Sequence, residues 1–464
     1  MSIKSWITEQ PDGLLDLLVS QRWFGDKSRT RRAMHPSLIL EFAHDGHQFG
    51  LLQVVFEFSE GPASTYFVPI MHRSDDHFVD ALHDPSFLSW IAEGFDSDRS
   101  LITATPDSGR LFWSVSGADH ASSWTSRSPR VLEGEQSNTS VMFGTEAIVK
   151  VFRKLQPGVN PDSEIVAFLS DHHAFPHVPT YLGSIILESN GDQEPIELAA
   201  VQGFVSNQGD SWRWLPKALG DSTAEDRTRL LTSIRTLGTR TGELHVALSD
   251  DDGVEEFASI IIGHPEVDAI EERLGREARN TASMLHRQGA CSHSESEELA
   301  SSLLASVSHA DALLGTLQTR VHGDYHLGQV LRVGDDFVII DFEGEPSRPM
   351  NERRQTHSPL KDVAGMLRSI DYAVATATQL STSTSPRDLF AWREDAERAF
   401  IDGYLGVVGR ETQALVPADP QAFAEALDIF MIEKALYEVR YELDNRPDWL
   451  EIPFGALRRI GTGG

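Results

Sequence analysis

The hydrophobic pattern of this chain changes near residue 207, and that change constrains the fold more than any other feature. Before it, short apolar stretches such as Phe49–Phe58 ("FGLLQVVFEF") and Ser64–Met71 are typical of antiparallel strands. After it, apolar residues recur at helical spacing, as in 224–249 and 388–408. A β-rich part followed by a helical part predicts a bilobal protein of the α+β class.

We predict three segments from this pattern. Residues 1–86 form a β-rich cap subdomain, residues 87–206 form a nucleotide-binding N-lobe with one helix, and residues 207–464 form a helical C-lobe. The further strands expected in the N-lobe are Arg110–Gly117, Ala147–Leu155 and Glu197–Val205. Its helix is expected at Pro161–Asp171, because proline suits the first helical position and early acids suit the positive end of the helix dipole.

The composition narrows the classes of partner and the compartment. With a formal net charge of -30, the chain lacks the basic surface that general nucleic-acid binding needs. No apolar stretch has the length of a membrane span, and the first residues lack the pattern of a secretory signal. The single cysteine, Cys291, excludes an intrachain disulfide. These features predict a cytoplasmic protein with neither a nucleic-acid nor a membrane partner.

The helical part contains one apolar hairpin with polar residues at its ends. It lies in Val321–Pro346, "VHGDYHLGQVLRVGDDFVIIDFEGEP". We take Gln329–Val333 and Phe337–Asp341 as its two strands, joined by a short turn. Antiparallel pairing then sets Gln329 opposite Asp341, with the two side chains near each other.

This pairing suggests a site for a metal and a phosphate. Gln329 and Asp341 suit Mg²⁺, which takes one or two protein oxygens together with substrate phosphates. Asp324 lies at the same end of the hairpin and would be free to accept a proton from an attacking hydroxyl. The alternative is a hairpin whose polar ends are ordinary. We accept that alternative for the turn residues Asp335 and Asp336.

The motifs around this hairpin resemble a known group of kinases. "HGDYHLGQ" followed by "DFEGEP" is similar to the catalytic loop and metal motif of the aminoglycoside-phosphotransferase clan, eukaryotic-like kinases that phosphorylate small molecules. Gln329 stands where these kinases usually have Asn, and Gly323 stands where protein kinases have Arg. The Phe-Glu-Gly after Asp341 also departs from the protein-kinase pattern. These departures resemble the bacterial maltokinases, which implies a protein-kinase-like fold with an N-terminal cap.

The resemblance extends over nearly the whole chain. "QRWFGDKSR" resembles the cap of the maltokinases, "EGEQSNTSVMF" their phosphate loop and "AIVKVFRKLQPGVNPDSEI" their nucleotide-lysine region. "TRTGELHVAL" and "SPLKDVAGMLRSIDYA" resemble their C-lobe helices, and "EKALYEVRYELDNRPDWLEIPF" resembles their terminal sugar-site segment. The hairpin motif specifies only the clan, whereas the cap and the terminal segment point to the maltokinases.

Lys150 is the candidate nucleotide lysine. It lies in an apolar strand, where an unpaired ammonium would be costly, so we expect Glu164 of the following helix as its partner and ATP phosphates as its ligand. The alternative is an edge-strand lysine that faces water.

The other candidate nucleotide contacts lie on both sides of Lys150. The segment before Lys150 consists of Ser137, Asn138, Thr139 and Ser140. Taken alone, this polar segment would be interpreted as a turn, but its position before Lys150 favours phosphate binding. By resemblance, the backbone of Gln202–Val205 meets adenine, with Gln202, Phe204 and Val205 as the residues concerned.

The terminal segment carries the candidate sugar contacts. They are Lys434, Tyr437, Glu438, Tyr441, Asn445 and Arg446. Aromatic rings and polar groups at helical spacing suit a sugar, and an aromatic helix packed on the core is an equal alternative from spacing alone. His322 is expected to be a hydrogen-bonding loop residue at the substrate site rather than a base. Glu343 could join the metal or act on the sugar, and Asp362 could bind the catalytic loop or simply begin a helix.

The resemblance implies an ATP- and Mg²⁺-dependent maltokinase. Asp324 would position the anomeric hydroxyl of maltose for attack on the γ-phosphate, and the product would feed α-glucan (glycogen) synthesis from trehalose, in association with trehalose synthase. The main rival is a kinase for another sugar, such as glucosamine, which the positive charges of Lys434 and Arg446 disfavour. A pseudokinase is disfavoured because Lys150, the expected partner Glu164 and the hairpin residues are all present.

Overall fold

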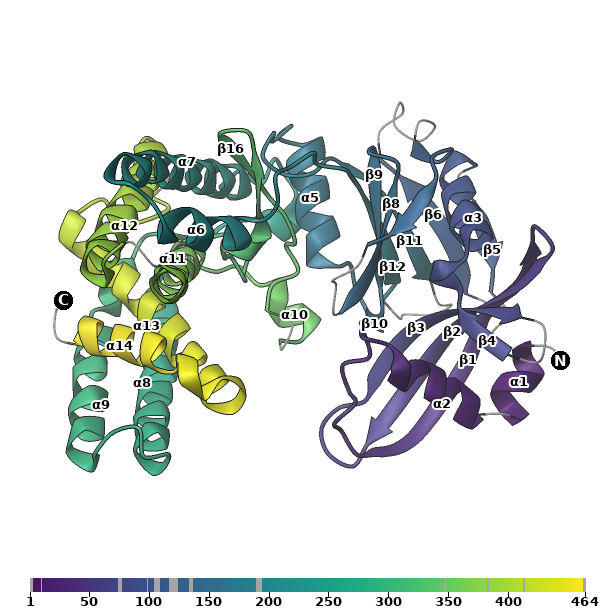
Figure 1. The fold of residues 1–464 in the computed structure, drawn as a ribbon, viewed down its shortest axis with the longest axis horizontal. Helices are drawn as coiled ribbons and strands as arrows, with labels where there is room; N and C mark the ends of the chain where they lie inside the picture. The colour runs from purple at the N-terminus through teal and green to yellow at the C-terminus, as the bar shows by residue number, and fades with distance from the viewer. Residues whose placement is uncertain are drawn as a thin grey trace. The chain divides into compact units, whose positions relative to one another are not determined.

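The chain forms two compact units in the computed structural model: Met1–Asp171 with Pro179–Ser206, and His172–Val178 with Asn207–Gly464 (Figure 1). The structure describes residues 3–9, 11–73, 77–97, 99–103, 109–116, 124–132, 137–188, 194–345, 348–381, 384–411 and 414–461. The first unit is rich in strands and the second is mostly helical, as the change of pattern near residue 207 predicts.

The first unit contains two antiparallel sheets. Its helices are α1 (Ile3–Glu9), α2 (Pro11–Ser20), α3 (Pro85–Asp96) and α5 (Pro161–Asp171). One sheet has the order β1-β2-β3-β10, with β4 beside β3, from Arg31–His44, His47–Phe58, Ser64–Arg73, Lys154–Leu155 and His77–Asp80. The other has the order β5-β6-β11-β12-β9-β8-β7, from Ser100–Ile102, Arg110–Val115, Tyr181–Glu188, Ile196–Gly203, Ala147–Phe152, Asn138–Phe143 and Pro129–Val131.

Both faces of the first sheet are buried, and the alternation of its strands explains how. Along β2, Leu52, Val54 and Phe56 point to one face and pack in a cluster with residues of α1 and α2. Phe49 and Leu51 point to the other face and pack in a cluster with α3 and the second sheet. Since successive side chains of a strand point to opposite faces, one apolar strand can serve two cores.

One buried arginine joins the two sheets. The chain passes from β9 of the second sheet through Arg153 directly into β10 of the first. The Arg153 guanidinium pairs with the Asp80 carboxylate, donates from Nε to Thr139 Oγ1 at 2.9 Å, and lies 4.3 Å from the Trp23 ring centroid. Arg153 and Asp80 are 0% and 6% exposed, so this cation and its partner are removed from water together.

The strands and the helix predicted for this unit are present, and the structure adds elements that were not predicted. The long strand β1 was missed, and its Pro36 is tolerated because β1 lies at the edge of its sheet. The N-lobe was predicted to hold a single helix, but α3 also falls within it, capped by Asp84 before Pro85. The division into cap and N-lobe at residue 86 stays a prediction.

A buried glutamate in β12 makes the stability of this unit depend on pH. Glu197 is 7% exposed, and its Oε2 accepts a hydrogen bond from the Asn160 backbone N–H at 3.0 Å. Burial raises the pKa of Glu197 to about 7 from a usual 4.5. The folded state therefore binds the proton more tightly than the unfolded state. The contribution of this carboxyl to stability is fully present below about pH 4.5 and is lost as the pH rises through 7.

We expect Glu197→Gln to remove this loss. At pH 8 the free energy of unfolding should rise by about 2 to 3 kcal/mol, since each pKa unit is worth about 1.4 kcal/mol. At pH 4 the substitution should change little, because the carboxyl is then neutral in both states. Urea unfolding at the two pH values measures the difference. Glu188→Gln, at an exposed site in the neighbouring strand β11, is the matched control. An equal effect of Glu197→Gln at both pH values would contradict the prediction.

The second unit is built from long helices around the hairpin. They are α6 (Ser211–Gly220), α7 (Ala224–Ser249), α8 (His264–Arg287), α9 (His293–Val307), α10 (Met350–Arg353), α11 (Leu360–Leu380), α12 (Pro386–Val408), α13 (Pro420–Asn445) and α14 (Glu451–Gly461). Its short strands are β13 (Ile260–Ile261), β14 (Leu317–Gln318), β15 (Val330–Val333) and β16 (Asp336–Ile339). Single 3-10 turns occur at Ala81–His83 in the first unit and at Glu255–Phe257, Ala310–Leu313, Leu327–Gln329 and Pro447–Trp449 in this one.

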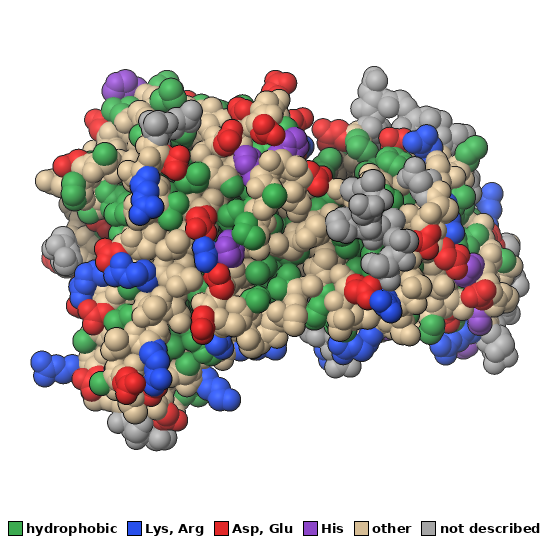
Figure 2. Space-filling view, turned by 90° about the horizontal axis from the view of Figure 1, so that it is seen from above, with side chains coloured by type: hydrophobic (Ala, Val, Ile, Leu, Met, Phe, Trp, Pro, Cys, Tyr) green, Lys and Arg blue, Asp and Glu red, His purple; other side chains and the backbone are tan. Residues whose placement is uncertain are grey.

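Local signals explain where several of these helices begin. A capping box of Thr223 and Asp226 starts α7, and Ser385 with Pro386 starts α12. Helices α8 and α9 lie side by side as an antiparallel pair (Figure 1). None of the helices in the described ranges is long and apolar enough to cross a membrane. On the face shown in Figure 2, Lys and Arg side chains lie among Asp and Glu side chains rather than in one basic field.

Candidate active site

The loop that carries Asp324 is fixed by one buried carboxylate. Asp362, in the first turn of α11, accepts the backbone N–H of His322 at 2.7 Å and that of Gly323 at 2.9 Å, and its Oδ2 lies 3.2 Å from His245 Nε2. Burial alone would raise the pKa of Asp362, but the contacts with His245 and the loop outweigh it and hold the pKa below its usual value. Of the two alternatives for Asp362, the contact with the catalytic loop is confirmed.

Other contacts hold the same loop on both sides of Asp324. His322 Nε2 lies 3.0 Å from the Ile340 carbonyl, and the Tyr325 hydroxyl lies 3.0 Å from Thr241 Oγ1 on α7. His326 Nδ1 accepts the N–H of Gly328 at 3.0 Å. His322 is thus a hydrogen-bonding residue of the loop, as predicted, and its place at the substrate site stays a prediction.

The hairpin has a tighter turn than predicted. Strand β15 pairs with β16 from Val330↔Ile339 to Val333↔Asp336, so only Gly334 and Asp335 form the turn. Gly334 has φ +65°, the conformation that favours glycine in two-residue hairpins. Asp336, predicted to be a turn residue, lies in β16 and binds the Arg240 guanidinium through two contacts of 2.8 Å.

This register corrects the predicted pairing of Gln329 with Asp341. The Ile340 N–H donates to the Gln329 carbonyl at 2.9 Å, so Gln329 lies opposite Ile340 rather than opposite Asp341. The two side chains nevertheless meet, because Gln329 Nε2 lies 2.9 Å from Asp341 Oδ2. Asp341 has φ +68°, a left-handed conformation that is costly for residues other than glycine and recurs at functional sites.

The Gln329–Asp341 pair fits a magnesium ion. In the structure the Gln329 amide donates to the Asp341 carboxylate. Rotation of the amide would turn its oxygen, in place of its nitrogen, toward a cation beside Asp341. An amide oxygen and one carboxylate are the one or two protein ligands that Mg²⁺ takes when phosphate and water complete its shell.

Asp324 is not the free carboxylate that was predicted. Its Oδ1 lies 3.3 Å from Nζ of Lys434, a residue of α13 that was expected to contact sugar. The two side chains are about 25% and 20% exposed. The sequence could not show this contact, because 110 residues separate the partners.

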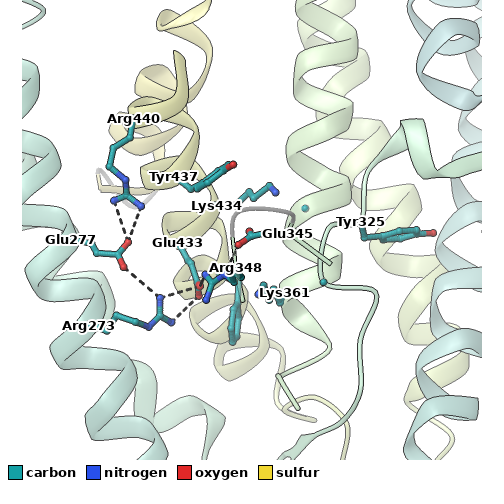
Figure 3. Close-up of a pocket in the computed structure, with 13 residues that line it drawn as sticks. Arg273, Glu277, Tyr325, Glu345, Arg348, Lys361, Glu433, Lys434, Tyr437 and Arg440 are labelled. Carbon is teal, nitrogen blue, oxygen red and sulfur yellow. Dashed lines mark hydrogen bonds and ion pairs between the residues drawn. The ribbon is translucent and has the colours of Figure 1, made fainter. Parts of the chain in front are cut away.

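A charged pocket opens beside this pair. Figure 3 shows Lys434, Tyr437 and Glu345 on one side of it and Arg273, Glu277 and Arg440 on the other. The pocket is partly open to solvent, and about 510 Å³ of space not filled by atoms lies in and in front of it. Its lining residues are Arg273, Glu277, Gly323, Tyr325, Glu345, Arg348, Lys361, Gly365, Phe430, Glu433, Lys434, Tyr437 and Arg440.

Ion pairs neutralise most of the charge in this pocket. Arg273 binds Glu433 through contacts of 3.0 and 3.1 Å, and Arg440 lies 3.2 Å from Glu277. Arg348 pairs with Glu345. Arg273 and Glu277 were not predicted as site residues, because α8, which carries them, was not predicted. Glu345 lies in the quoted "DFEGEP" motif, and this was the only signal for it.

The candidate sugar residues of the terminal segment separate into two groups. Lys434 and Tyr437 line the pocket. Glu438 does not, because it is buried and binds Arg368 of α11 at 2.9 Å from Oε2 to Nε. Tyr441 is 43% exposed outside the lining residues.

The last two candidates lie at the end of α13. Asn445 Nδ2 donates to the Tyr441 carbonyl, and Arg446 pairs with Glu442 at 2.8 Å. Neither residue lines the pocket. Glu343, near the hairpin, accepts a hydrogen bond on its backbone carbonyl from Arg353 at 3.0 Å. The roles proposed for these three side chains stay predictions.

In the first unit, Lys150 contacts a carboxylate of α5 that was not predicted. Its Nζ lies 3.2 Å from Oδ2 of Asp162, at the second position of α5. The predicted pairing of Lys150 with Glu164 stays a prediction. Asp162 is buried where Glu164 is only partly so, which places the earlier carboxylate against β9. Gln202 Nε2 reaches the same Oδ2 at 3.3 Å. Lys150 and Gln202 of adjacent strands therefore converge on one carboxylate.

The predicted phosphate loop lies only partly within the described residues. Residues 133–136, which would form its tip, are outside them. Asn138, Thr139 and Ser140 belong to β8 and pair with β9, so they are strand residues rather than the open turn that was expected. The Thr139 hydroxyl accepts from Arg153. At the other expected nucleotide contact, the Phe204 N–H donates to the Glu146 carbonyl at 2.8 Å.

Comparison with known proteins supplies the family. The model of the phosphotransferase enzyme family matches residues 128–375, just over half of the chain, including the Lys150 strand, the Asp324 loop and the hairpin. The chain belongs to this phosphotransferase family. Its α+β class, with a β-rich first part and a helical second part, agrees with the kinase-like fold predicted from the sequence.

Relatives of this phosphotransferase include glucosamine kinases. One from Streptacidiphilus jiangxiensis is 27% identical over 362 residues, which are 75% of this chain and 76% of that protein. Another, from Mycolicibacterium smegmatis (strain ATCC 700084 / mc(2)155), is 27% identical over 348 residues, 72% of this chain and 80% of that protein. Two solved structures, a glucosamine kinase (crystal form B) and a glucosamine kinase in complex with glucosamine, ADP and inorganic phosphate, superpose with TM-scores of 0.71 and 0.68. Each is 20% identical to this chain, and the match covers 96% of this chain and 98% of that one.

These relatives overturn the maltokinase prediction. The proteins that this phosphotransferase resembles over three quarters of its sequence are named for glucosamine. The predicted maltose substrate, the link to α-glucan synthesis and the association with trehalose synthase are wrong with it. The charge argument against glucosamine also fails, because Lys434 is paired with Asp324 and Arg446 with Glu442.

Proposed function

We propose that this phosphotransferase is an ATP-dependent kinase that transfers the γ-phosphate of ATP to a hydroxyl group of glucosamine. The observation that carries the proposal is the position of Asp324 on an anchored loop beside a charged pocket. A carboxylate in that position can orient an acceptor hydroxyl and take its proton. The two relatives named glucosamine kinase supply the choice of sugar.

The pocket has groups that suit an amino sugar. Tyr437 offers a ring face to the C–H groups of a pyranose, and paired charges around it offer hydrogen bonds to hydroxyls. Asp324 and Glu345 are among the acids whose charge acts on Lys434, and a carboxylate is the partner that a protonated amino group requires. In this proposal Glu438 is a structural residue, since Arg368 occupies its carboxylate.

We assign nucleotide and metal binding to the residues predicted for them, with one addition. Lys150 binds phosphates and is oriented by Asp162, which its ammonium contacts at 3.2 Å. Ser137, the strand residues Asn138–Ser140 and the segment Gln202–Val205 complete the ATP contacts. Gln329 and Asp341 hold Mg²⁺, which neutralises phosphate charge during transfer. With a single cysteine and a requirement for ATP, we place the reaction in the cytoplasm.

The test is an acceptor comparison with the full-length protein. ADP release is measured with glucosamine, glucose and maltose at equal concentrations, with ATP and Mg²⁺ in excess. The phosphorylated carbon of the product is then located by NMR. We expect turnover with glucosamine and at least tenfold lower kcat/KM for glucose, because glucose lacks the amino group that a carboxylate would bind. Turnover of glucose but not glucosamine would refute the choice of sugar, and absence of ADP release with all three would refute the kinase activity.

A further inference from the structure

The contact between Lys434 and Asp324 gives this lysine a role other than sugar binding. We propose that Lys434 is a positioning residue that holds the Asp324 carboxylate in the orientation needed to accept the proton of the acceptor hydroxyl. The proposal deepens the proposed kinase function and rests on it. It assigns to α13, in the terminal part of the chain, a direct part in arranging the catalytic loop.

The lysine end of the contact is held by its neighbours on α13. Glu433, the preceding residue, binds Arg273 of α8 through two contacts of 3.0 and 3.1 Å. Glu438, one turn later, binds Arg368 of α11 through contacts of 2.9 and 2.8 Å. The Arg273–Glu433 pair is bidentate and fixes geometry as well as charge, and Arg368 meets the single oxygen Oε2 of Glu438 with Nε and Nη2. Lys434 therefore projects from a helix that is tied to two others within about one turn.

The aspartate end of the contact is held equally firmly. Asp362 accepts the backbone N–H groups of His322 and Gly323, directly before Asp324. The hydroxyl of Tyr325, directly after it, bonds Thr241 of α7. Both partners of the 3.3 Å contact thus belong to anchored backbone, so the contact follows from the framework of the unit rather than from a mobile surface side chain.

The geometry of the carboxylate suits this division of roles. Lys434 Nζ contacts Oδ1, and within the described part of the chain Oδ2 makes no hydrogen bond. An acceptor hydroxyl could donate to Oδ2 while Oδ1 stays fixed. As the hydroxyl oxygen forms its bond to the γ-phosphorus, its proton passes to Asp324, and the bond to the β-phosphate oxygen breaks with its electron pair leaving on ADP.

The charges around the lysine keep it protonated. Burial alone would lower the pKa of Lys434, but Asp324, Glu345 and Glu438 outweigh burial and raise it. His326 on the same loop and Tyr437 on α13 also interact electrostatically with Asp324. A charged ammonium beside Oδ1 can therefore hold the orientation of the carboxylate while Oδ2 faces the acceptor hydroxyl.

The experiment compares Lys434→Met with Lys434→Arg in the full-length protein. Lys434→Met should lower kcat on the order of 100-fold, because an incorrectly oriented catalytic group costs about that much. The KM for Mg-ATP should change less than threefold. The KM for glucosamine should also change less than threefold, because Lys434 holds the carboxylate rather than the sugar. Lys434→Arg should recover at least a tenth of the wild-type kcat, and Lys217→Met, at an exposed lysine of α6, should leave kcat unchanged.

Three results would overturn the proposal. A raised KM for glucosamine with unchanged kcat in Lys434→Met would make Lys434 a sugar contact. Unchanged kcat with unchanged KM would leave it no role in the reaction. Equal destabilisation by Lys434→Met in the wild-type and Asp324→Asn backgrounds, measured by urea unfolding, would show that the two residues do not interact. If the wild type phosphorylates no sugar, the proposed function fails, and the effect of Lys434→Met on rate can still be followed on slow ATP hydrolysis.

Discussion

Asp324→Asn is expected to lower kcat for phosphate transfer by about 10²- to 10⁴-fold, the range that a positioned acid or base contributes. The amide keeps the size of the side chain and can still receive a hydrogen bond from Lys434. It cannot take a proton from the acceptor hydroxyl. Affinity for Mg-ATP should be retained. The measurement is ADP release with glucosamine at saturating ATP, supported by single-turnover kinetics to separate chemistry from product release.

The matched control for this substitution is Asp335→Asn. Asp335 is an exposed residue of the hairpin turn, and the chemical change is identical. It should retain wild-type kcat. The free energy of unfolding of Asp324→Asn should lie within about 1 kcal/mol of wild type, because the ion pair with Lys434 is partly exposed. If the wild type shows only the same background phosphorylation as Asp324→Asn, the kinase function is refuted.

Arg153→Met is expected to destabilise the first unit by about 3 to 5 kcal/mol, the cost of leaving a buried charge without its partner. Asp80 is 6% exposed and would keep a carboxylate in the core. The substitution also removes the hydrogen bond to Thr139 and the contact with the Trp23 ring. Urea unfolding followed by far-UV circular dichroism measures the loss.

A second substitution shows whether charge is the cause. Asp80 Oδ1 also accepts the Leu82 N–H at 3.1 Å and so caps a helical turn. Asp80→Asn can keep that hydrogen bond while it removes the charge. We therefore expect Arg153→Met with Asp80→Asn to be more stable than Arg153→Met alone. If the double variant is no more stable, the loss arises from packing around the missing guanidinium rather than from the unpaired carboxylate.

Local patterns were sufficient for much of the fold. Apolar spacing and capping signals predicted α5, α7 and α12, since each of these elements is specified by residues close together in the sequence. Alternation predicted β2 and β3 in the same way. Helix α8 was missed although Pro265 and Glu266 mark its first turn. The register of the hairpin depends on Gly334 adopting a positive φ in a two-residue turn, and a one-residue error there moved Asp341.

The candidate site was less accessible to sequence reasoning than the fold. Motif spacing identified Asp324, Gln329 and Asp341, but the partners of charged side chains depend on tertiary packing. Lys434 reaches Asp324 across 110 residues, and Lys150 contacts Asp162, which the motif did not single out. The sugar was predicted incorrectly because the catalytic motif concerns the phosphate, which every kinase of the clan shares.

The left-handed backbone at Asp341 restricts which amino acids can occupy that position. A β-branched residue would clash there, and most other side chains would cost folding energy, so glycine, asparagine and aspartate are the residues that the conformation tolerates best. Of these three, only aspartate carries the negative charge that a divalent cation attracts. The backbone conformation and the metal chemistry therefore favour aspartate independently. We expect almost every substitution at this position to reduce either stability or activity.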